Sequence, residues 1–364
     1  MFTKLEFNLI KNRFKYNLNN LLIKRLNRGQ SLLINDQVLH RMTVNTCGKI
    51  YGNNLSKKWY LRYAPKTGID VNIECVDTKP NDKTSPTIVA LHGCPGSHMD
   101  FTQLIADFGT RYRVVVPNFP DFSLTDSTNT FWHSAQEKAQ FVRDILKLLD
   151  IHSIDCLVTH SSAIFPASYL WLKDDQQNND FKIKSLCLFS NPGPKWFTKK
   201  GVILSSVLVN ISRVQQIRQY LRKIWTKKWT NRLGLRNQIS NYDNLALLLS
   251  TYYHSDTQTV DKRLKKLAEM QIPTLSVFST KDKLFKDDIF YSLFENLGTN
   301  YEDFDVYEEY QNLLIQKSTN MRWIKVVNIT GGGHYVFSTH WPLVYNYIEE
   351  LLQKIDSKDP KLLN

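Results

Sequence analysis

Three side chains of different chemical types each follow an apolar run of the sequence, and together they could perform acyl transfer. Ser161 offers a hydroxyl nucleophile, His334 offers a general base, and Asp282 offers a carboxylate that can orient the base. Each of them comes after a segment that reads as a β-strand. Because ligands of parallel α/β sheets bind beyond the carboxyl ends of the strands, these three side chains are expected to meet at one site. The sequence therefore predicts a Ser–His–Asp triad.

The nucleophile is predicted from the turn that ends in Ala163. A catalytic serine on a sharp strand-to-helix turn needs small residues two positions before and after it, usually glycine. Ala163 meets this need after Ser161, whereas Thr159 before it is β-branched and departs from the pattern. Ser162 is the weaker alternative, because its flanking residues are His160 and a branched apolar residue. The reading without catalysis is an ordinary serine in a strand-to-helix turn.

The base is predicted from a glycine-rich loop, Gly331-Gly332-Gly333-His334, near the C-terminus. The glycines let the backbone turn freely and leave the imidazole exposed. His340 is a competitor, but it begins a helix. A surface or packing histidine is the alternative without catalysis.

The acid is predicted at Asp282, which follows the strand of residues 273–279. Asp287 and Asp288 are alternatives close by in the chain. In some hydrolases the acid follows the preceding strand, but here that position holds Asn191, which cannot serve as an anion.

A backbone oxyanion hole is predicted from the turn His92-Gly93-Cys94-Pro95. Gly93 allows a close approach of the backbone, and Pro95 fixes the turn, whose peptide bond can be cis. The N–H groups of Cys94 and Ser162 would then face the developing oxyanion. Cys94 lies in this turn and not on the strand-to-helix elbow, which disfavours it as a nucleophile.

The elements that must position these residues alternate between strands and helices. Several strands are continuous runs of Val, Ile and Leu, which is typical of strands buried on both faces of a parallel sheet. Helical periodicity is strongest in residues 134–149 and in the closing segment 343–355. The fold class predicted is α/β, with a mostly parallel eight-stranded sheet and helices on both faces. The eight strands are expected at residues 58–63, 70–77, 87–92, 112–117, 154–160, 184–190, 273–279 and 323–329.

The chain is expected to form one core that carries inserted segments. Residues 1–57 read as a basic N-terminal extension, 58–192 and 273–355 as the core, 193–272 as a helical cap, 286–321 as an acidic insert, and 356–364 as a tail. Between positions 195 and 236 there are eleven basic residues and no acidic one. Between 287 and 316 there are eight acidic residues and no Lys or Arg. The two segments are expected to neutralise each other in part.

Composition excludes several classes of function. The five cysteines are odd in number and contain no C-x-x-C pair, which favours reduced thiols in a cytoplasmic protein. A mitochondrial presequence or a peripheral membrane location are the alternatives. The nine histidines lack metal-ligand spacing and no phosphate-binding glycine motif is present, so neither a metal nor a nucleotide cofactor is expected. Nucleic acid binding is not expected, although the net charge of the chain is +13, because only the basic cap would support it and such surfaces are more often simply solvated.

The order Ser, Asp, His and the turns that carry them resemble the α/β-hydrolase superfamily over residues 58–355. The H-G-x-P turn resembles those of epoxide hydrolases and prolyl iminopeptidases, and residues 92–101 more closely resemble a group of uncharacterised invertebrate α/β-hydrolases. Epoxide hydrolases use aspartate where this chain has Ser161, which disfavours that activity. Residues 117–123 resemble the D-x-P-G-F-G segment of the superfamily, but Asp121 and Ser123 replace its glycines.

The function predicted is a serine hydrolase that acts on an ester or a similar acyl substrate. The alternative is a catalytically weak or inactive hydrolase scaffold that binds a ligand, because the elbow lacks its usual glycines. The apolar run 201–211 leads into a segment of Lys, Arg and Trp at 222–229. This pattern suits the surface of an anionic membrane and a lipid-like substrate. The alternative is that the apolar run lines the pocket and the core.

Overall fold

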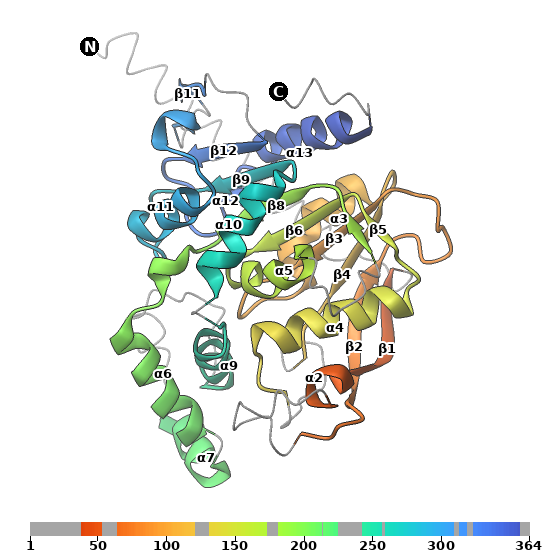
Figure 1. Cartoon of the computed structure of the whole chain (residues 1–364), viewed down its shortest axis with the longest axis vertical. Coiled ribbons are helices and arrows are strands. Elements are labelled where there is room, and N and C mark those ends of the chain that lie inside the picture. Colours follow the sequence, from red (N-terminus) through yellow and green to blue (C-terminus); the bar gives the residue numbers. More distant parts are fainter. Residues whose placement is uncertain are drawn as a thin grey trace, which may run out of the picture.

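The computed structural model describes residues 38–52, 64–120, 131–172, 181–212, 214–224, 242–256, 259–308, 313–318 and 323–356. Its main feature is one large mixed sheet (Figure 1). The ten strands of this sheet are β1 (Leu39–Thr46), β2 (Ile69–Asp77), β3 (Thr87–Leu91), β4 (Arg113–Pro117), β6 (Cys156–His160), β8 (Leu186–Phe189), β9 (Thr274–Phe278), β10 (Phe304–Tyr307), β11 (Leu314–Gln316) and β12 (Ile324–Ile329). A separate two-stranded sheet joins β5 (Ser153–Ile154) and β7 (Lys182–Ile183).

The strands lie in the order β1-β2-β4-β3-β6-β8-β9-β12-β10-β11. From β4 to β10 all neighbouring strands are parallel. The antiparallel pairs are β1 with β2, β2 with β4, and β10 with β11, so they lie toward the two edges. The predicted mostly parallel α/β fold is confirmed, but the predicted count of eight strands is wrong, because the sheet has ten strands among the described residues. The strand expected at 58–63 lies outside the described residues.

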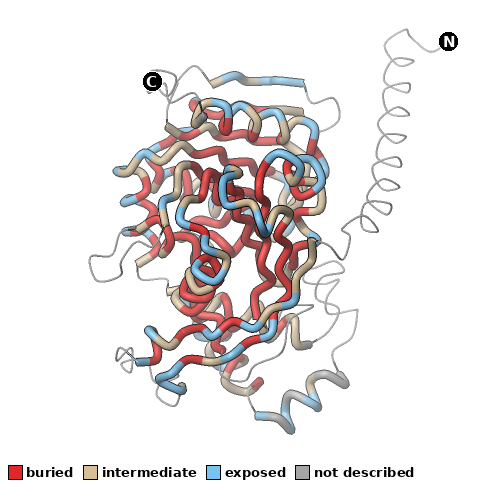
Figure 2. The backbone as a smooth tube through the Cα atoms, turned by 90° about the vertical axis from the view of Figure 1, so that its right-hand side faces the viewer, coloured by how far each residue is buried: buried red, intermediate tan, exposed pale blue. Residues whose placement is uncertain are grey.

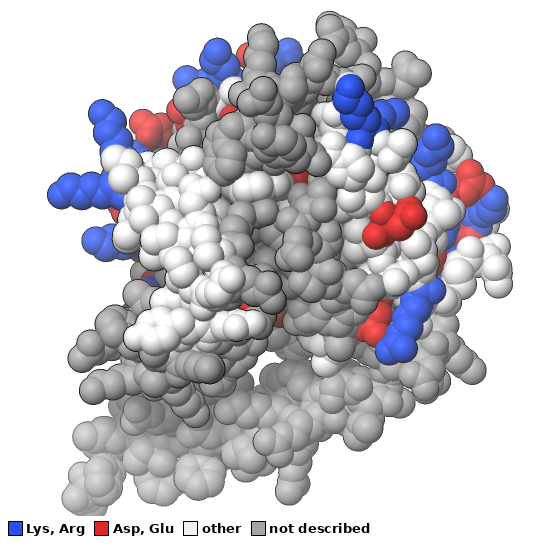
Figure 3. All heavy atoms as spheres, turned by 90° about the horizontal axis from the view of Figure 1, so that it is seen from below, with Lys and Arg blue, Asp and Glu red and all other residues white. Residues whose placement is uncertain are grey.

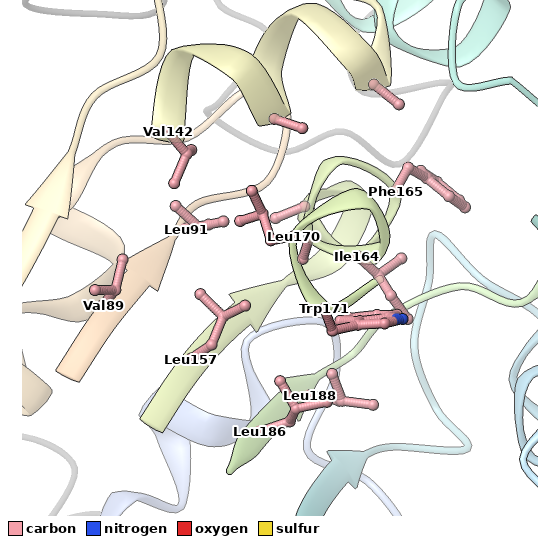
Figure 4. Packing of buried hydrophobic residues seen from close by; sticks show 14 of the residues in the cluster. Val89, Leu91, Val142, Leu157, Ile164, Phe165, Leu170, Trp171, Leu186 and Leu188 are labelled. Atoms are coloured by element: carbon pink, nitrogen blue, oxygen red, sulfur yellow. The ribbon is translucent and has the colours of Figure 1, made fainter. Parts of the chain in front are cut away.

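Helices cover both faces of the sheet, and the central strands alternate between two apolar clusters. In β3, Val89 and Leu91 belong to the cluster on one face, while Ile88 and Ala90 belong to the cluster on the other. Figure 4 shows α4 and α5 packed on the first face, where Val142 and Trp171 approach the strand residues. Figure 2 shows that the buried residues gather in the interior of the molecule, with exposed residues toward its outside. Burial on both faces explains why these strands are uninterrupted apolar runs.

The described helices connect the strands. They are α2 (Gly48–Gly52), α3 (Thr102–Phe108), α4 (Ala135–Leu148), α5 (Ile164–Trp171), α6 (Lys199–Ser212), α7 (Gln215–Ile224), α9 (Tyr242–Tyr253), α10 (Val260–Met270), α11 (Asp287–Asn296), α12 (Val336–Thr339) and α13 (Trp341–Asp356). Short 3₁₀ helices lie at η3 (His98–Phe101), η4 (Ser161–Ala163), η5 (Pro194–Trp196) and η6 (Tyr301–Asp303). Ser134 caps α4 in a reciprocal capping box with Glu137, which explains where that helix begins.

Two segment boundaries differ from those predicted from the sequence. The structure places residues 39–52 in the core and not in an N-terminal extension, because β1 pairs with β2 and α2 buries Ile50 and Tyr51. The acidic segment 286–321 is not separate from the core either, because β10 and β11 extend the sheet beyond β12. Strand β1 is half-exposed, and β10 and β11 are short, so none of the three sequences contains a long continuous apolar run.

The segment 193–272 contains only helices among its described elements. Figure 1 shows α6, α7 and α9 beyond one end of the sheet, on the side where α5 lies. The expected neutralisation between this segment and the acidic segment is not seen for three of its lysines. Lys195, Lys199 and Lys200 are exposed and form no ion pair with a described residue.

Candidate active site

Four neighbouring parallel strands bring the three predicted residues to one edge of the sheet. Ser161 follows β6, Asp282 follows β9, and His334 follows β12, and β8 lies between β6 and β9. The backbone N–H of Gly333 donates to Ser279 Oγ at 3.2 Å, which ties the loop after β12 to the loop after β9. All three side chains therefore lie beyond the carboxyl ends of the strands, where this fold class binds its ligands.

His334 and Asp282 form a short hydrogen bond. His334 Nδ1 lies 2.6 Å from Asp282 Oδ2, and the carboxylate is fully buried. The other carboxylate oxygen, Oδ1, accepts the backbone N–H groups of Leu284 at 2.7 Å and Phe285 at 3.2 Å. Because an ionised carboxylate can only accept, Nδ1 must carry the proton and Nε2 is left as the free acceptor. This is the tautomer that a general base requires.

Ser161 lies on a strained turn between β6 and α5. Its φ angle is +54°, in the left-handed region that non-glycine residues seldom adopt. A Cβ built on Gly93 would lie 2.8 Å from the Cβ of Ser161, so only glycine fits beside the serine. Among the residues that the structure describes, Ser161 Oγ and His334 Nε2 form no hydrogen bond. In ligand-free enzymes such bonds are often long and tighten when substrate binds.

Thr159 occupies the position where a glycine is usual, and its environment explains how it is tolerated. The Thr159 hydroxyl is buried and donates to Asn191 Oδ1 at 3.1 Å. Asn191 Nδ2 in turn donates to the carbonyl oxygen of Ser161 at 2.6 Å. The side chain at the alternative acid position thus supports the turn that carries the serine. The sequence excluded Asn191 as an acid but did not indicate this structural role.

The turn at 92–95 is fixed by buried hydrogen bonds. His92 Nε2 accepts the backbone N–H of Phe119 at 3.0 Å, and Nδ1 donates to the carbonyl oxygen of Gly93 at 2.8 Å. Burial lowers the pKa of His92 to about 3, so its imidazole is neutral and holds the turn without charge. The Cys94–Pro95 peptide bond is cis. The backbone N–H groups of Cys94 and Ser162 donate to no acceptor among the described residues.

A buried amine lies next to this turn and was not predicted from the sequence. Lys138 of α4 donates to Thr251 Oγ1 of α9 at 2.8 Å, and both side chains are buried. Burial lowers the pKa of Lys138 to about 8, whereas the neighbouring Cys94 acts to raise it. Burial also raises the pKa of the Cys94 thiol to about 11, against the opposite effect of Lys138. The thiol is therefore protonated at neutral pH, which disfavours Cys94 as a nucleophile.

A second buried pair lies behind His334. The ring of His160 lies 4.9 Å from the ring of His334, and His160 Nδ1 is 4.0 Å from Asp100 Oδ2. Burial lowers the pKa of His160 well below its usual value and raises the pKa of Asp100 to about 7. Both shifts favour the neutral forms, so we do not regard this contact as an ion pair at neutral pH. His160 thus adds no positive charge beside the His334 imidazole.

The competing residues lie elsewhere. Asp287 and Asp288 are exposed in the first turn of α11, and no hydrogen bond joins either of them to His334. His340 is buried beside α13, where Nδ1 lies 2.9 Å from Thr339 Oγ1. Ser162 lies in the first turn of the helical segment after the elbow. Within the described ranges, no group of three or more His, Cys, Asp or Glu side chains could hold a metal ion.

Comparisons with known proteins agree with this architecture. Residues 53–353 match the family described as "Alpha/beta hydrolase of unknown function (DUF1057)". A Caenorhabditis elegans protein, "Uncharacterized protein F35H12.5", is 22% identical over 196 residues. This alignment covers 50% of the chain and 54% of that relative, so the chain spans about half the length of the curated relative it matches.

Solved structures share the fold at low identity. A thermophilic esterase from Thermogutta terrifontis superposes with a TM-score of 0.57 and 13% identity, over 87% of this chain and 99% of the esterase. A structure from a study of carboxylesterases of the Thaumarchaeon Nitrososphaera gargenis superposes with a TM-score of 0.54 and 12% identity, over 81% of this chain and 98% of that structure. A haloalkane dehalogenase from Bradyrhizobium elkani superposes with a TM-score of 0.54 and 11% identity, over 88% of this chain and 100% of the dehalogenase. The sheet order, the strained turn at Ser161 and the match over residues 53–353 lead to one conclusion: this chain belongs to the family of α/β-hydrolases designated DUF1057.

Proposed function

We propose that the protein is a serine hydrolase that cleaves a carboxylic ester or a similar acyl substrate. The observation that carries this proposal is the 2.6 Å bond between His334 and the buried Asp282, at the edge of the sheet where Ser161 occupies a left-handed turn. Esterases among the proteins of similar fold support the same reaction class. A serine at the elbow disfavours the reactions of those hydrolases that need a carboxylate nucleophile there.

The reaction would proceed in two steps. Ser161 Oγ attacks the acyl carbon while its proton passes to His334 Nε2, and Asp282 stabilises the imidazolium that forms. The tetrahedral intermediate then collapses, and His334 returns the proton to the leaving alkoxide, which departs as the alcohol. In the second step, water attacks the acyl-enzyme with His334 again as base, and the carboxylic acid and free Ser161 are released.

The oxyanion would be held by the backbone N–H groups of Cys94 and Ser162. Both donors lack a partner among the described residues, as expected for groups reserved for a ligand. One such donor is typically worth about 10²–10³-fold in rate. The charge of Lys138, close enough to influence the Cys94 thiol, would also favour negative charge at this turn.

The helical segment 193–272 would cover the site as a cap. Phe285 packs against His334 at 5.2 Å and against Trp196 of η5 at 5.4 Å between ring centroids, and Trp196 also stacks on Phe165. On the other side, Thr251 of α9 contacts the pair Lys138 and Cys94. Aromatic side chains beside the proposed nucleophile and base would favour an apolar acyl group, which supports a lipid-like substrate.

A panel of substrates tests the proposed reaction class. We expect hydrolysis of p-nitrophenyl esters at least about 10⁶-fold above the spontaneous rate, the lower end of enzymatic acceleration. Chain lengths from acetate to decanoate should show rising kcat/KM, because each methylene that enters an apolar site contributes about 0.8 kcal/mol. Release of p-nitrophenolate is the measurement.

Styrene oxide and 1-chlorobutane are the matched alternatives in this panel. Turnover of either in place of the esters would contradict a serine mechanism. A folded protein that turns over none of the substrates, yet binds an acyl ligand, would support the inactive scaffold instead.

A further inference from the structure

Helix α6 exposes large apolar side chains and buries two serines, which is the reverse of an ordinary surface helix. Its buried positions are Ser205, Val209 and Ser212, which share one face at helical spacing and pack toward α9. The opposite face exposes Ile203, Leu204 and Val207, with 67%, 59% and 51% of each residue accessible. A helix of a soluble domain normally buries its apolar stripe and exposes its polar residues. This reversed pattern leaves the outer face of α6 apolar.

Further apolar side chains are exposed just before and within α7. Val214, Ile217 and Tyr220 are exposed, while Leu221 packs against Leu245 of α9. Six of the twelve large apolar side chains that are exposed among the described residues thus lie between positions 203 and 220. We call the six residues Ile203, Leu204, Val207, Val214, Ile217 and Tyr220 the α6–α7 face. Exposed apolar side chains gathered on neighbouring helices often mark an interaction site.

The charged residues of α6 and α7 themselves have one sign. Lys199 and Lys200 are exposed and lie three to five residues before Ile203 and Leu204, so they border the same side of α6. Neither forms an ion pair with a described residue, and α6 and α7 contain no Asp or Glu. Figure 3 shows an uncharged area on the left, the side where α6 lies in Figure 1, with Lys and Arg side chains along its outer edge and Asp or Glu side chains nearby.

The lengths of these helices restrict how they could meet a membrane. Helix α6 has 14 residues and α7 has 10. A helix needs about 20 apolar residues to cross a bilayer, and no helix of the described residues is long and apolar enough. Short helices with an apolar face and adjacent Lys or Arg instead lie in the plane of the interface, with the apolar side chains among the acyl chains.

We propose that the α6–α7 face docks the protein on the surface of an anionic lipid bilayer. Ile203, Leu204 and Val207 would enter the outer layer of the lipid, and Lys199 and Lys200 would contact the anionic headgroups. The one-signed charge favours this occupant over a second copy of the chain, because two such faces would repel each other. The proposal goes beyond the hydrolase reaction and does not depend on it, so Ser161→Ala protein should bind vesicles as the wild type does.

Sedimentation with vesicles tests this proposal. Wild-type protein should pellet with sucrose-loaded vesicles of 70% phosphatidylcholine and 30% phosphatidylserine but not with pure phosphatidylcholine, and salt should weaken the binding. The variant Lys200→Glu/Leu204→Gln reverses one charge and removes one apolar side chain on the same face of α6. Its partition coefficient should fall at least about tenfold, since both contributions are lost.

A matched control is available on α4. Lys147 and Leu148 are exposed there, and Lys147→Glu/Leu148→Gln makes the same two chemical changes away from the α6–α7 face. This control should bind vesicles as the wild type does. Wild-type protein that stays in the supernatant at low salt, or an equal loss in both variants, would overturn the proposal. So would sedimentation velocity that shows a wild-type dimer converted to monomer by Lys200→Glu/Leu204→Gln, because a second copy would then cover the face.

Discussion

Replacement of Ser161 by alanine is expected to reduce kcat for ester hydrolysis by about 10⁶-fold, the loss caused by removing a nucleophile that works with its base as a unit. The methyl group of alanine fits the space of the hydroxymethyl group, and no hydrogen bond of the fold depends on Ser161 Oγ among the described residues. The bond from Asn191 to the Ser161 carbonyl oxygen would remain. Circular dichroism should therefore be unchanged while turnover of p-nitrophenyl esters falls to the residual level.

Ser185→Ala is the matched control for this variant. Ser185 is also buried, but it directly precedes β8 and thus lies at the amino ends of the parallel strands, away from the candidate site. Its hydroxyl donates there to the carbonyl oxygen of Asp155. Its loss should lower stability slightly and leave kcat unchanged. A folded Ser161→Ala protein that keeps wild-type kcat would show that Ser161 is not the nucleophile.

Asp282→Asn is expected to reduce kcat by about 10⁴-fold, the loss that this change causes in trypsin-like proteases. The side-chain oxygen of asparagine can still accept the N–H groups of Leu284 and Phe285, so the loop should keep its shape. The amide nitrogen would then face His334 Nδ1 and could only donate to it. The imidazole would be forced into the tautomer with a proton on Nε2, which cannot accept the serine proton.

Asp287→Asn and Asp288→Asn are the controls for the acid. Both carboxylates are exposed in the first turn of α11, where the helix dipole favours negative charge but burial and the neighbouring Asp288 raise the pKa of Asp287. Loss of either charge should therefore change stability by no more than about 1 kcal/mol and leave activity unchanged. Steady-state kinetics with one ester distinguishes the three variants. A large loss of kcat in Asp287→Asn or Asp288→Asn, with Asp282→Asn harmless, would show that Asp282 is not the acid of the triad.

The residues at the candidate site could be predicted because each stands where a buried strand ends. A strand buried on both faces is a largely apolar run, so its end is visible in the sequence, as at His160 before Ser161 and at Ile329 before His334. Parallel strands then place their carboxyl ends at one edge of the sheet. The order of the strands was not needed for this prediction.

The parts that the sequence did not reveal depend on contacts between distant segments. Thr159 read as a departure from the usual glycine, and only the fold shows that Asn191 bonds both its hydroxyl and the Ser161 carbonyl oxygen. Lys138 lies in an amphipathic helix where lysine usually faces solvent, and its burial beside Thr251 depends on α9. The edge strand β1 was missed because its exposed face carries polar residues such as Arg41.

Covalent labelling by a fluorophosphonate tests the central claim, that His334 activates Ser161, most directly. The reagent phosphonylates serine hydroxyls that a neighbouring base deprotonates, and peptide mapping by mass spectrometry identifies the residue that carries the adduct. Wild-type protein and Ser185→Ala should carry one adduct, on Ser161, whereas Ser161→Ala and His334→Ala should remain unlabelled. Equal labelling of wild type and Ser161→Ala, or no labelling of the folded wild type, would contradict the account.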